Sequence, residues 1–232
     1  MCTRFAYAPR DDQLSVVEQG FGRRVREELS EFPANHDVRP AQRVPVIRWL
    51  TGGQPHVVSA RWGFIPPWVM TDQAELEFQT ELEHADSEGK WRYAWRYARC
   101  LIPATAWYET APAVGGMFGA APGDLLPGQV ADRTLKVANA SGQLFMLAGL
   151  HGFLTTEQGH RETTSILTRQ APPGLEWARQ RVPCMVPRKA WNEWLYPYAT
   201  DPRRIAGMLD QADPWLEARV TMQRIGRHDV IN

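Results

Sequence analysis

Hydrophobic positions in the first third of the chain predict one helix followed by a pair of strands. From Asp11 to Leu29, apolar residues recur at spacings of three and four, which is the period of a helix with one buried face. Apolar runs then follow at Val44–Leu50 and His56–Trp62, separated by the turn-forming residues Thr51–Pro55. These two runs predict a β-hairpin.

The middle of the chain is dominated by β-type patterns. Arg99–Tyr108 is expected to form one buried strand, and Thr134–Ala138 with Leu144–Leu150 a second hairpin. Three further runs predict short strands at Thr163–Thr168, Val182–Val186 and Ala218–Met222. Between them, Ala111–Asp132 is rich in Gly, Pro and Ala and is expected to be a surface loop insertion.

Helix signals return in the last third of the chain. Arg188–Leu195 has tryptophans at helical spacing, and Asp201-Pro202 and Asp213-Pro214 each place a capping Asp before a Pro at the first helical position. Helices at the ends with strands between them predict an α+β fold with a mostly antiparallel, barrel-like sheet. We expect residues 1–232 to form one domain.

Composition narrows the function classes. The 232 residues carry 26 Lys+Arg and 26 Asp+Glu, so the formal net charge is zero. Proteins that bind duplexes non-specifically usually have a basic excess, although a local basic groove remains compatible with neutrality. No apolar run approaches the ~20 residues that span a bilayer, and no secretory leader is visible, so a cytoplasmic protein without a membrane partner is expected.

The cysteines predict neither disulfides nor a metal site. Cys2, Cys100 and Cys184 are odd in number and widely spaced, and the six histidines are scattered. We therefore expect no metal and no organic cofactor. Cys100 and Cys184 lie in apolar runs and are predicted to be inert core thiols.

Cys2 carries the most specific chemistry in the sequence. Removal of Met1 leaves an α-amine beside a thiol, and both groups are partly nucleophilic at neutral pH. One reaction open to this 1,2-aminothiol is condensation with an aldehyde to a Schiff base, which the thiolate closes to a five-membered thiazolidine. The other is attack of the thiolate on an amide, with the α-amine as base.

Glu109 is a second candidate. It ends an apolar stretch within Trp107-Tyr108-Glu109, where a carboxyl with a raised pKa is placed for general acid–base work, or lies at the surface as a strand terminus.

Taken together, a series of short blocks resembles the SRAP (SOS response-associated peptidase) family. In chain order they are Met1–Phe5, Asp37–Pro40, Trp62–Pro66, Arg99–Ala104, Trp107–Glu109, Phe145–Leu150, Ser165–Thr168 and Arg181–Pro183. The resemblance implies a β-rich core flanked by helices, with the processed N-terminal Cys in a groove for single-stranded DNA. It also implies a thiazolidine crosslink between that Cys and the aldehyde of an abasic site, and removal of the residues ahead of the Cys.

The family's functional residues carry over in part. Cys2 matches the nucleophile, and Glu109 matches the catalytic Glu, with proton transfer as its implied role. Gln79 stands at the family's catalytic Asn, and Arg179 stands at its catalytic His. Arginine does not shuttle protons near pH 7, but it can hold a phosphate.

DNA-contacting positions are also altered. Glu81 replaces a DNA-contacting Arg, and Asp37 replaces the Asn of the Asp37–Pro40 block. We predict that Arg4, Trp68 and Arg181 bind DNA, the tryptophan by stacking on a base.

Three functions follow from these residues. The leading prediction is a DNA-damage protein that crosslinks through Cys2 to abasic sites in single-stranded DNA and removes its own Met1. The second is a DNA- or protein-binding module of phage-related origin that kept the fold and lost the reaction. The third is an N-terminal Cys peptidase or amidase. A monomer is expected.

Overall fold

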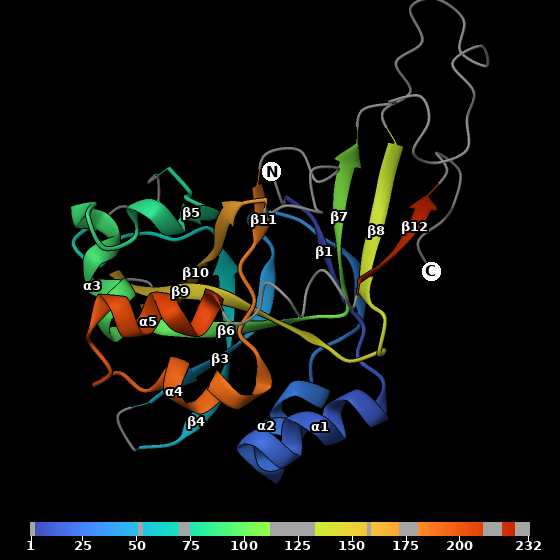
Figure 1. The fold of residues 1–232 in the computed structure, drawn as a ribbon. Helices are drawn as coiled ribbons and strands as arrows, with labels where there is room; N and C mark the ends of the chain where they lie inside the picture. Colours follow the sequence, from blue (N-terminus) through green and yellow to red (C-terminus); the bar gives the residue numbers. More distant parts are fainter. Residues whose placement is uncertain are drawn as a thin grey trace, which may run out of the picture.

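The computed structural model describes residues 3–50, 53–69, 75–111, 133–156, 159–171, 181–210 and 220–225. Its elements are mostly strands, gathered into two sheets with helices at their flanks (Figure 1).

The larger sheet closes on itself as a five-stranded barrel. Its strands are β3 (Arg43–Trp49), β4 (Pro55–Trp62), β6 (Arg99–Ala104), β9 (Phe145–Thr156) and β10 (Gly159–Gln170). The hydrogen-bonded order runs β10-β4-β3-β6-β9, and β9 pairs with β10 again, which leaves this ring without an open edge. All pairings in the ring are antiparallel except that of β4 with β10.

β10 continues past the barrel and takes two further partners. β5 (Gln79–Glu81) pairs with it in parallel, and β11 (Arg181–Pro183) pairs with it antiparallel. β5 and β11 lie on opposite edges of β10, so this end of β10 brings together segments about a hundred residues apart in sequence.

The smaller sheet contains the N-terminal strand. Its order is β12 (Val220–Ile225), β8 (Arg133–Asn139), β7 (Ala106–Ala111), β1 (Phe5–Tyr7) and β2 (Asn35–Val38). β1 therefore lies between β2 and β7 and pairs with both antiparallel. All three residues of β1 are buried, so the start of the chain is anchored in the sheet.

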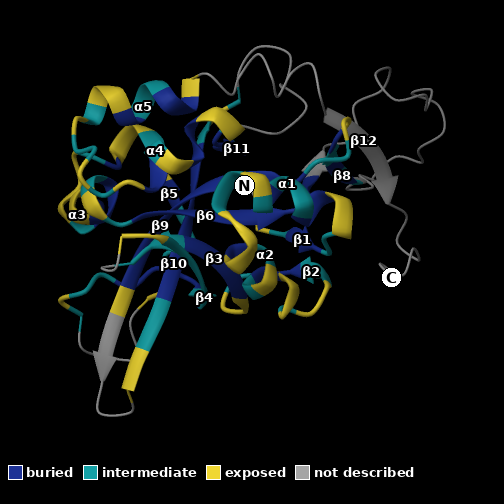
Figure 2. Cartoon of the chain, turned by 90° about the horizontal axis from the view of Figure 1, so that it is seen from below, coloured by how far each residue is buried: buried dark blue, intermediate teal, exposed yellow. Residues whose placement is uncertain are grey.

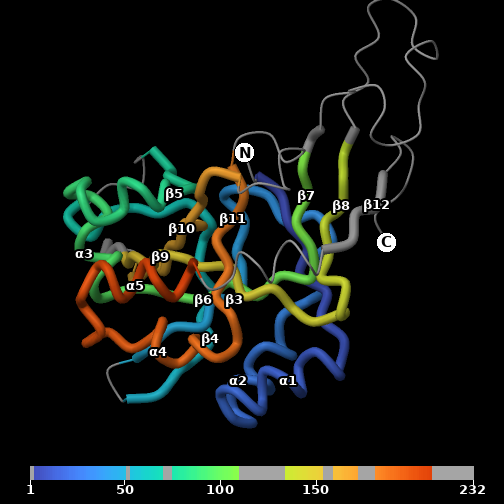
Figure 3. Tube along the Cα trace, in the orientation of Figure 1, coloured from blue at the N-terminus to red at the C-terminus, as the bar shows by residue number. Residues whose placement is uncertain are grey.

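Helices cover two sides of the barrel (Figures 1 and 3). The first side has α1 (Asp11–Phe21) and α2 (Arg23–Ser30). The other side has α3 (Gly89–Tyr97), α4 (Trp191–Leu195) and α5 (Pro202–Asp210), with the 3₁₀ turns Leu82–His84 (η1) and Arg188–Ala190 (η2) nearby in sequence. Each α-helix buries its apolar stripe, as Leu14 and Val17 do on α1. Within the barrel, β6 is buried along its whole length, whereas β4 is mostly half-buried and the first residues of β10 are exposed (Figure 2).

The α+β, mostly antiparallel, barrel-like fold is confirmed, as is the hairpin β3–β4. The prediction of one continuous helix over Asp11–Leu29 is wrong, because the segment forms two helices, α1 and α2. Gly22 has a φ of 89°, and it separates α1 from α2.

Two strand predictions need correction. Arg99–Tyr108 is not one strand, because the chain leaves the barrel at Thr105, whose N–H bonds to the carbonyl of Ala6, and joins the other sheet as β7. The hairpin of Thr134–Ala138 with Leu144–Leu150 is also wrong. β8 pairs with β7 and β12, and β9 pairs with β6 and β10, so the two segments belong to different sheets.

Some predictions fall outside the described residues, namely all but the first residue of the Ala111–Asp132 loop and the cap at Asp213-Pro214. Asp201 does cap α5, since its side chain accepts from the Arg203 N–H at 3.0 Å. None of the helices in the described ranges has the length and apolar character needed to cross a bilayer.

Candidate functional site

The pairing of β1 with β7 places the start of the chain beside Glu109. Phe5 is opposite Trp107 in this pair, and the Tyr108 N–H donates to the Arg4 carbonyl at 3.0 Å. Glu109 is the next residue along β7, and its side chain is 2% exposed. The sheet therefore holds Glu109 next to the strand that begins within three residues of Cys2.

The Arg4 side chain is held in place by Asp37. Its Nε donates to Asp37 Oδ1 at 2.5 Å, and its guanidinium lies 4.5 Å from the centre of the Tyr108 ring. Arg39 bonds to the same carboxylate at 3.1–3.2 Å. Burial opposes ionisation of Asp37, but the hydrogen bonds from Arg39 and Arg4 outweigh it and lower the pKa of this carboxyl.

A second group of predicted site residues lies on β5 and β11. Gln79 is half-buried and pairs with Ile166 of β10. Arg181 pairs with Gln170, four residues further along the same strand. Between them, Thr80 is buried and shares a 2.7 Å hydrogen bond with Ser165. The β10 scaffold fixes the positions of both predicted residues.

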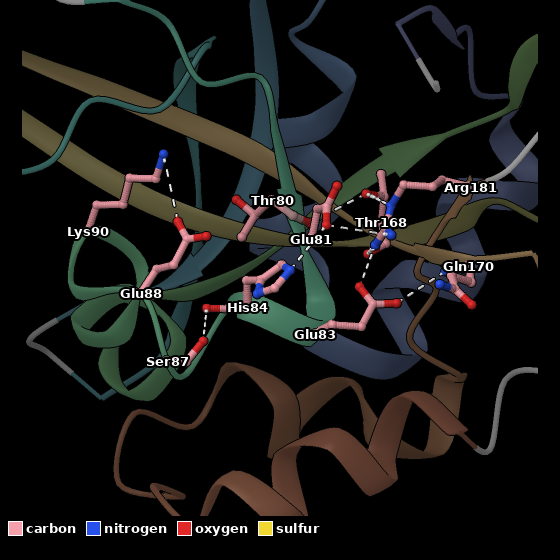
Figure 4. Close-up of polar contacts among 10 residues, drawn as sticks. All are labelled: Thr80, Glu81, Glu83, His84, Ser87, Glu88, Lys90, Thr168, Gln170 and Arg181. Carbon is pink, nitrogen blue, oxygen red and sulfur yellow. Dashed lines mark hydrogen bonds and ion pairs between the residues drawn. The ribbon is translucent and has the colours of Figure 1, made fainter.

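Arg181 is enclosed by acceptors (Figure 4). Its Nη2 donates to Glu83 Oε2 at 2.5 Å and to the Thr168 carbonyl at 2.8 Å, and its Nε donates to the Thr168 hydroxyl at 3.1 Å. Glu81 lies 3.7 Å from Nη1, and only 15% of the Arg181 side chain is exposed. The positive charge of Arg181 is therefore shared with two carboxylates.

Glu81 and Glu83 are fixed by further contacts. His84 Nε2 lies 3.5 Å from Glu81, and the Gln170 N–H donates to Glu83 at 3.3 Å. Partial burial opposes ionisation of Glu83, but the hydrogen bond from Arg181 outweighs it and lowers the pKa of Glu83. Two carboxylates therefore face one arginine at this end of β10, which leaves the group with a net negative charge.

Trp68 is 56% exposed, in agreement with the prediction that it is available for stacking, whereas Trp62 is fully buried in the core. Cys2 and Arg179 lie outside the described residues, so their roles stay predictions. Cys100 and Cys184 are buried, and burial raises the pKa of the Cys100 thiol to about 12, as expected for an inert thiol. In the described ranges, no cluster of His, Cys, Asp and Glu is suited to a metal ion.

Sequence reasoning missed one polar cluster, on β3, β9 and β10. Glu162 accepts from Arg48 Nη2 at 2.8 Å and is in direct hydrogen-bond contact with His151 Nε2, whose side chain is 6% exposed. No motif marks these residues, because Arg48 is 114 positions from Glu162 in the chain and joins the β9–β10 hairpin only in the folded protein.

The sequence profile of the SOS response associated peptidase (SRAP) family matches residues 1–228. This chain belongs to the SRAP family. A relative from Bacillus subtilis named abasic site processing protein YoqW is 26% identical, over 92% of this chain and 88% of the relative. A second one, abasic site processing protein YoaM, is 24% identical over 90% of this chain and 85% of the relative.

Solved structures share the fold. A protein from Bacteroides thetaiotaomicron superposes with a TM-score of 0.74 at 17% identity, covering 97% of this chain and 93% of its own. A phage-related protein from Bordetella bronchiseptica gives a TM-score of 0.72 at 19% identity, covering 97% and 95%. The architecture of this SRAP chain is thus one seen before in experimental structures.

Proposed function

We propose that this SRAP protein acts in the response to DNA damage by linking covalently, through Cys2, to abasic sites in single-stranded DNA. The observation that carries the proposal is the position of Glu109, a buried carboxyl on the strand paired with the start of the chain. The names of the Bacillus relatives, both called abasic site processing proteins, support the same substrate.

The reaction begins when Met1 is removed. The α-amine of Cys2 adds to the aldehyde of the ring-opened abasic sugar and gives a carbinolamine. Loss of one water forms a Schiff base, and the Cys2 thiolate then adds to the imine carbon and closes a thiazolidine ring. One water is released for each link, and no oxidant or cofactor is consumed.

Glu109 is the proton carrier in this mechanism. It donates a proton to the departing hydroxyl of the carbinolamine and takes one back as the ring closes. A buried carboxyl is suited to this exchange because bulk water does not compete with the reacting atoms.

The other predicted residues position DNA. Gln79 offers its amide where the family has a catalytic Asn, and Arg179 binds a phosphate beside the lesion rather than moving a proton. Arg4 directly precedes β1 and Arg181 is the first residue of β11, and both bind the phosphate backbone. Trp68 stacks on a base.

One set of contacts favours the second candidate, a SRAP fold that binds without reacting. Both DNA-binding arginines already have carboxylate partners, Asp37 for Arg4 and Glu83 for Arg181. DNA must compete with these carboxylates. We therefore expect DNA to bind more weakly than it would to two arginines without carboxylate partners, while the covalent step stays intact.

A crosslinking assay separates the two candidates. The protein is mixed with a single-stranded oligonucleotide containing one abasic site and is run on a denaturing gel, beside Cys2→Ser and Cys2→Ala variants. We expect a stable adduct only with Cys2. Both variants keep the α-amine once Met1 is removed, so each should give an adduct only after borohydride reduction of its Schiff base. A wild-type protein that has lost Met1, binds the oligonucleotide and forms no adduct would overturn the proposed reaction.

A further inference from the structure

Exposed aromatic side chains gather around one cavity. In the described part of the chain, the large apolar side chains that are exposed are Trp68, Tyr93, Tyr97, Phe153, Tyr196 and Tyr198. All of them except Trp68 line a single cavity of about 460 Å³. Concentrations of this kind on a soluble protein mark interaction sites, and the volume is in the range of ligand pockets.

The rings come from three separate segments. Tyr93 and Tyr97 lie one turn apart on α3, with ring centres 5.3 Å apart. After α4, Tyr196 contacts both Trp49 and Tyr198 edge-on, at 5.7 and 5.4 Å. Phe153 is added from β9. Figure 1 shows α3 and α4 on the same side of the barrel. The fold therefore assembles an aromatic surface from segments far apart in sequence.

The charged groups lining the cavity are cationic. They are Arg48, Lys90 and Arg99, and no Asp or Glu is among the described lining residues. Glu162 pairs with Arg48, and both Glu77 and Glu88 pair with Lys90, but none of the three carboxylates lines the cavity.

Arg99 adds a positive charge that no carboxylate offsets in the described structure. Its guanidinium donates to the carbonyls of Trp194, Trp95 and Tyr196 at 2.6–2.8 Å. Burial lowers the pKa of Arg99 to about 10, which still leaves it charged at neutral pH. The field of a buried charge is weakly screened, so the cavity favours anionic ligands.

We propose that this cavity is a second binding site for single-stranded DNA, in which unpaired bases stack on Tyr93, Tyr97 and Tyr198. Aromatic rings beside positive charge are the combination that binds single strands with little dependence on sequence. Quaternary ammonium ligands also bind aromatic cages, but the cationic lining disfavours them. This inference rests on the proposed function, since it assumes that the protein meets single-stranded DNA.

The cavity adjoins the segment of Trp68. Phe64 and Pro67 line the cavity, and Trp68 follows Pro67 directly in the chain. Trp68 is the remaining exposed aromatic residue of the described set, and it is already assigned to DNA. A strand that stacks on Trp68 therefore passes next to a residue that lines the cavity.

The test measures the affinity for labelled oligothymidine without an abasic site, by fluorescence anisotropy. The double variant Tyr93→Ala/Tyr97→Ala removes both rings, and its matched control Tyr93→Phe/Tyr97→Phe keeps them and removes only the hydroxyls. We expect the alanine variant to bind at least about fivefold more weakly and the phenylalanine variant to bind within about twofold of wild type. The two side chains are 54% and 47% exposed, so both variants should fold, which thermal unfolding checks.

Two results would overturn the second site. One is an unchanged affinity of the alanine variant. The other is an equal loss in the phenylalanine variant, because the hydroxyls rather than the rings would then make the contact. Crosslinking to a short abasic oligonucleotide, just long enough to fill the Cys2 site, is measured in parallel. It should be unchanged in the alanine variant, and its absence in wild type would count against the proposed reaction and leave the tyrosine-dependent binding standing.

Discussion

Glu83 and Arg181 are separated by 98 positions in the chain, yet Arg181 Nη2 lies 2.5 Å from Glu83 Oε2, at the end of β10 where β5 and β11 pair with its two edges. Glu81 approaches the same guanidinium at 3.7 Å. An arginine assigned to DNA is thus held by two acidic residues of its own chain. A phosphate can bind Arg181 only if it displaces these carboxylates from the guanidinium.

Removing these two charges should strengthen DNA binding. In a Glu81→Gln/Glu83→Gln variant, we expect affinity for single-stranded DNA to rise about threefold to tenfold, because Arg181 is freed and two repulsive charges are lost. The slope of log affinity against log salt should steepen by about 0.7 for each phosphate gained. Salt-dependent anisotropy titrations measure both quantities.

The matched control is Glu18→Gln/Glu27→Gln. It also neutralises two glutamates that pair with arginines, but on α1 and α2. Equal gains in the two double variants would show that net charge alone is responsible, and they would contradict a local role for Glu81 and Glu83.

Breaking the ion pair between Arg4 and Asp37, which lies near Glu109, should also strengthen DNA binding. Asp37→Asn restores the amide of the family's block and leaves Arg4 free to bind phosphate, so DNA affinity should rise about twofold to fivefold. Asp12→Asn is the control, because Asp12 pairs with Arg10 at 2.9 Å on the exposed face of α1. A gain in the control that matches the gain at Asp37 would argue against Arg4 as a DNA contact.

Glu109 should affect the rate of linkage more than the binding of DNA. Glu109→Gln keeps the shape of the side chain and removes its proton transfer, so the rate of adduct formation should fall about 10²- to 10⁴-fold. Affinity for undamaged single-stranded DNA should stay within about twofold of wild type. Single-turnover crosslinking and anisotropy separate the two effects, and an unchanged rate would remove Glu109 from the mechanism.

His151 predicts a pH dependence of stability that is separate from the reaction. Burial lowers the pKa of His151, although its contact with Glu162 opposes this. Since the folded pKa lies below the unfolded value of about 6.5, the stabilisation is present above pH 6.5 and is lost as the pH falls toward the folded pKa. The free energy of unfolding should therefore decrease on acidification from pH 6.5, by at most about 1.4 kcal/mol per pH unit from this group.

Urea denaturation at several pH values tests this directly. His151→Asn should flatten the dependence between pH 6.5 and 5.5, and His84→Asn, at an exposed histidine, is the control. An identical slope in wild type and His151→Asn would show that other groups cause the acid sensitivity.

The sequence was sufficient for the fold class because strand and helix periods are local, as in the β3–β4 hairpin. It failed where pairing is non-local. β8 and β9 are neighbours in sequence with a turn between them, yet they do not pair with each other. β8 pairs with β7 and β12 in one sheet, and β9 pairs with β6 and β10 in the other. The break of the first helix at Gly22 depends on a single backbone angle that its apolar pattern does not encode.

The same distinction holds for the site. Motif order predicted Glu109 and Arg181, because each lies in a recognisable block, and Gln79 by its position relative to those blocks. The carboxylate partners of Arg181 and the cavity beside Tyr196 arise from contacts between distant segments, which no local pattern specifies.

The most direct test of the account is the intact mass of the denatured complex formed with abasic single-stranded DNA. We expect an adduct equal to the protein without Met1 plus the oligonucleotide minus one water, absent from Cys2→Ala. A stable adduct of Cys2→Ala, with the mass of that variant without Met1 plus the oligonucleotide minus one water, would contradict a thiazolidine link through Cys2. So would the absence of any adduct in a wild-type protein that is folded and has lost Met1.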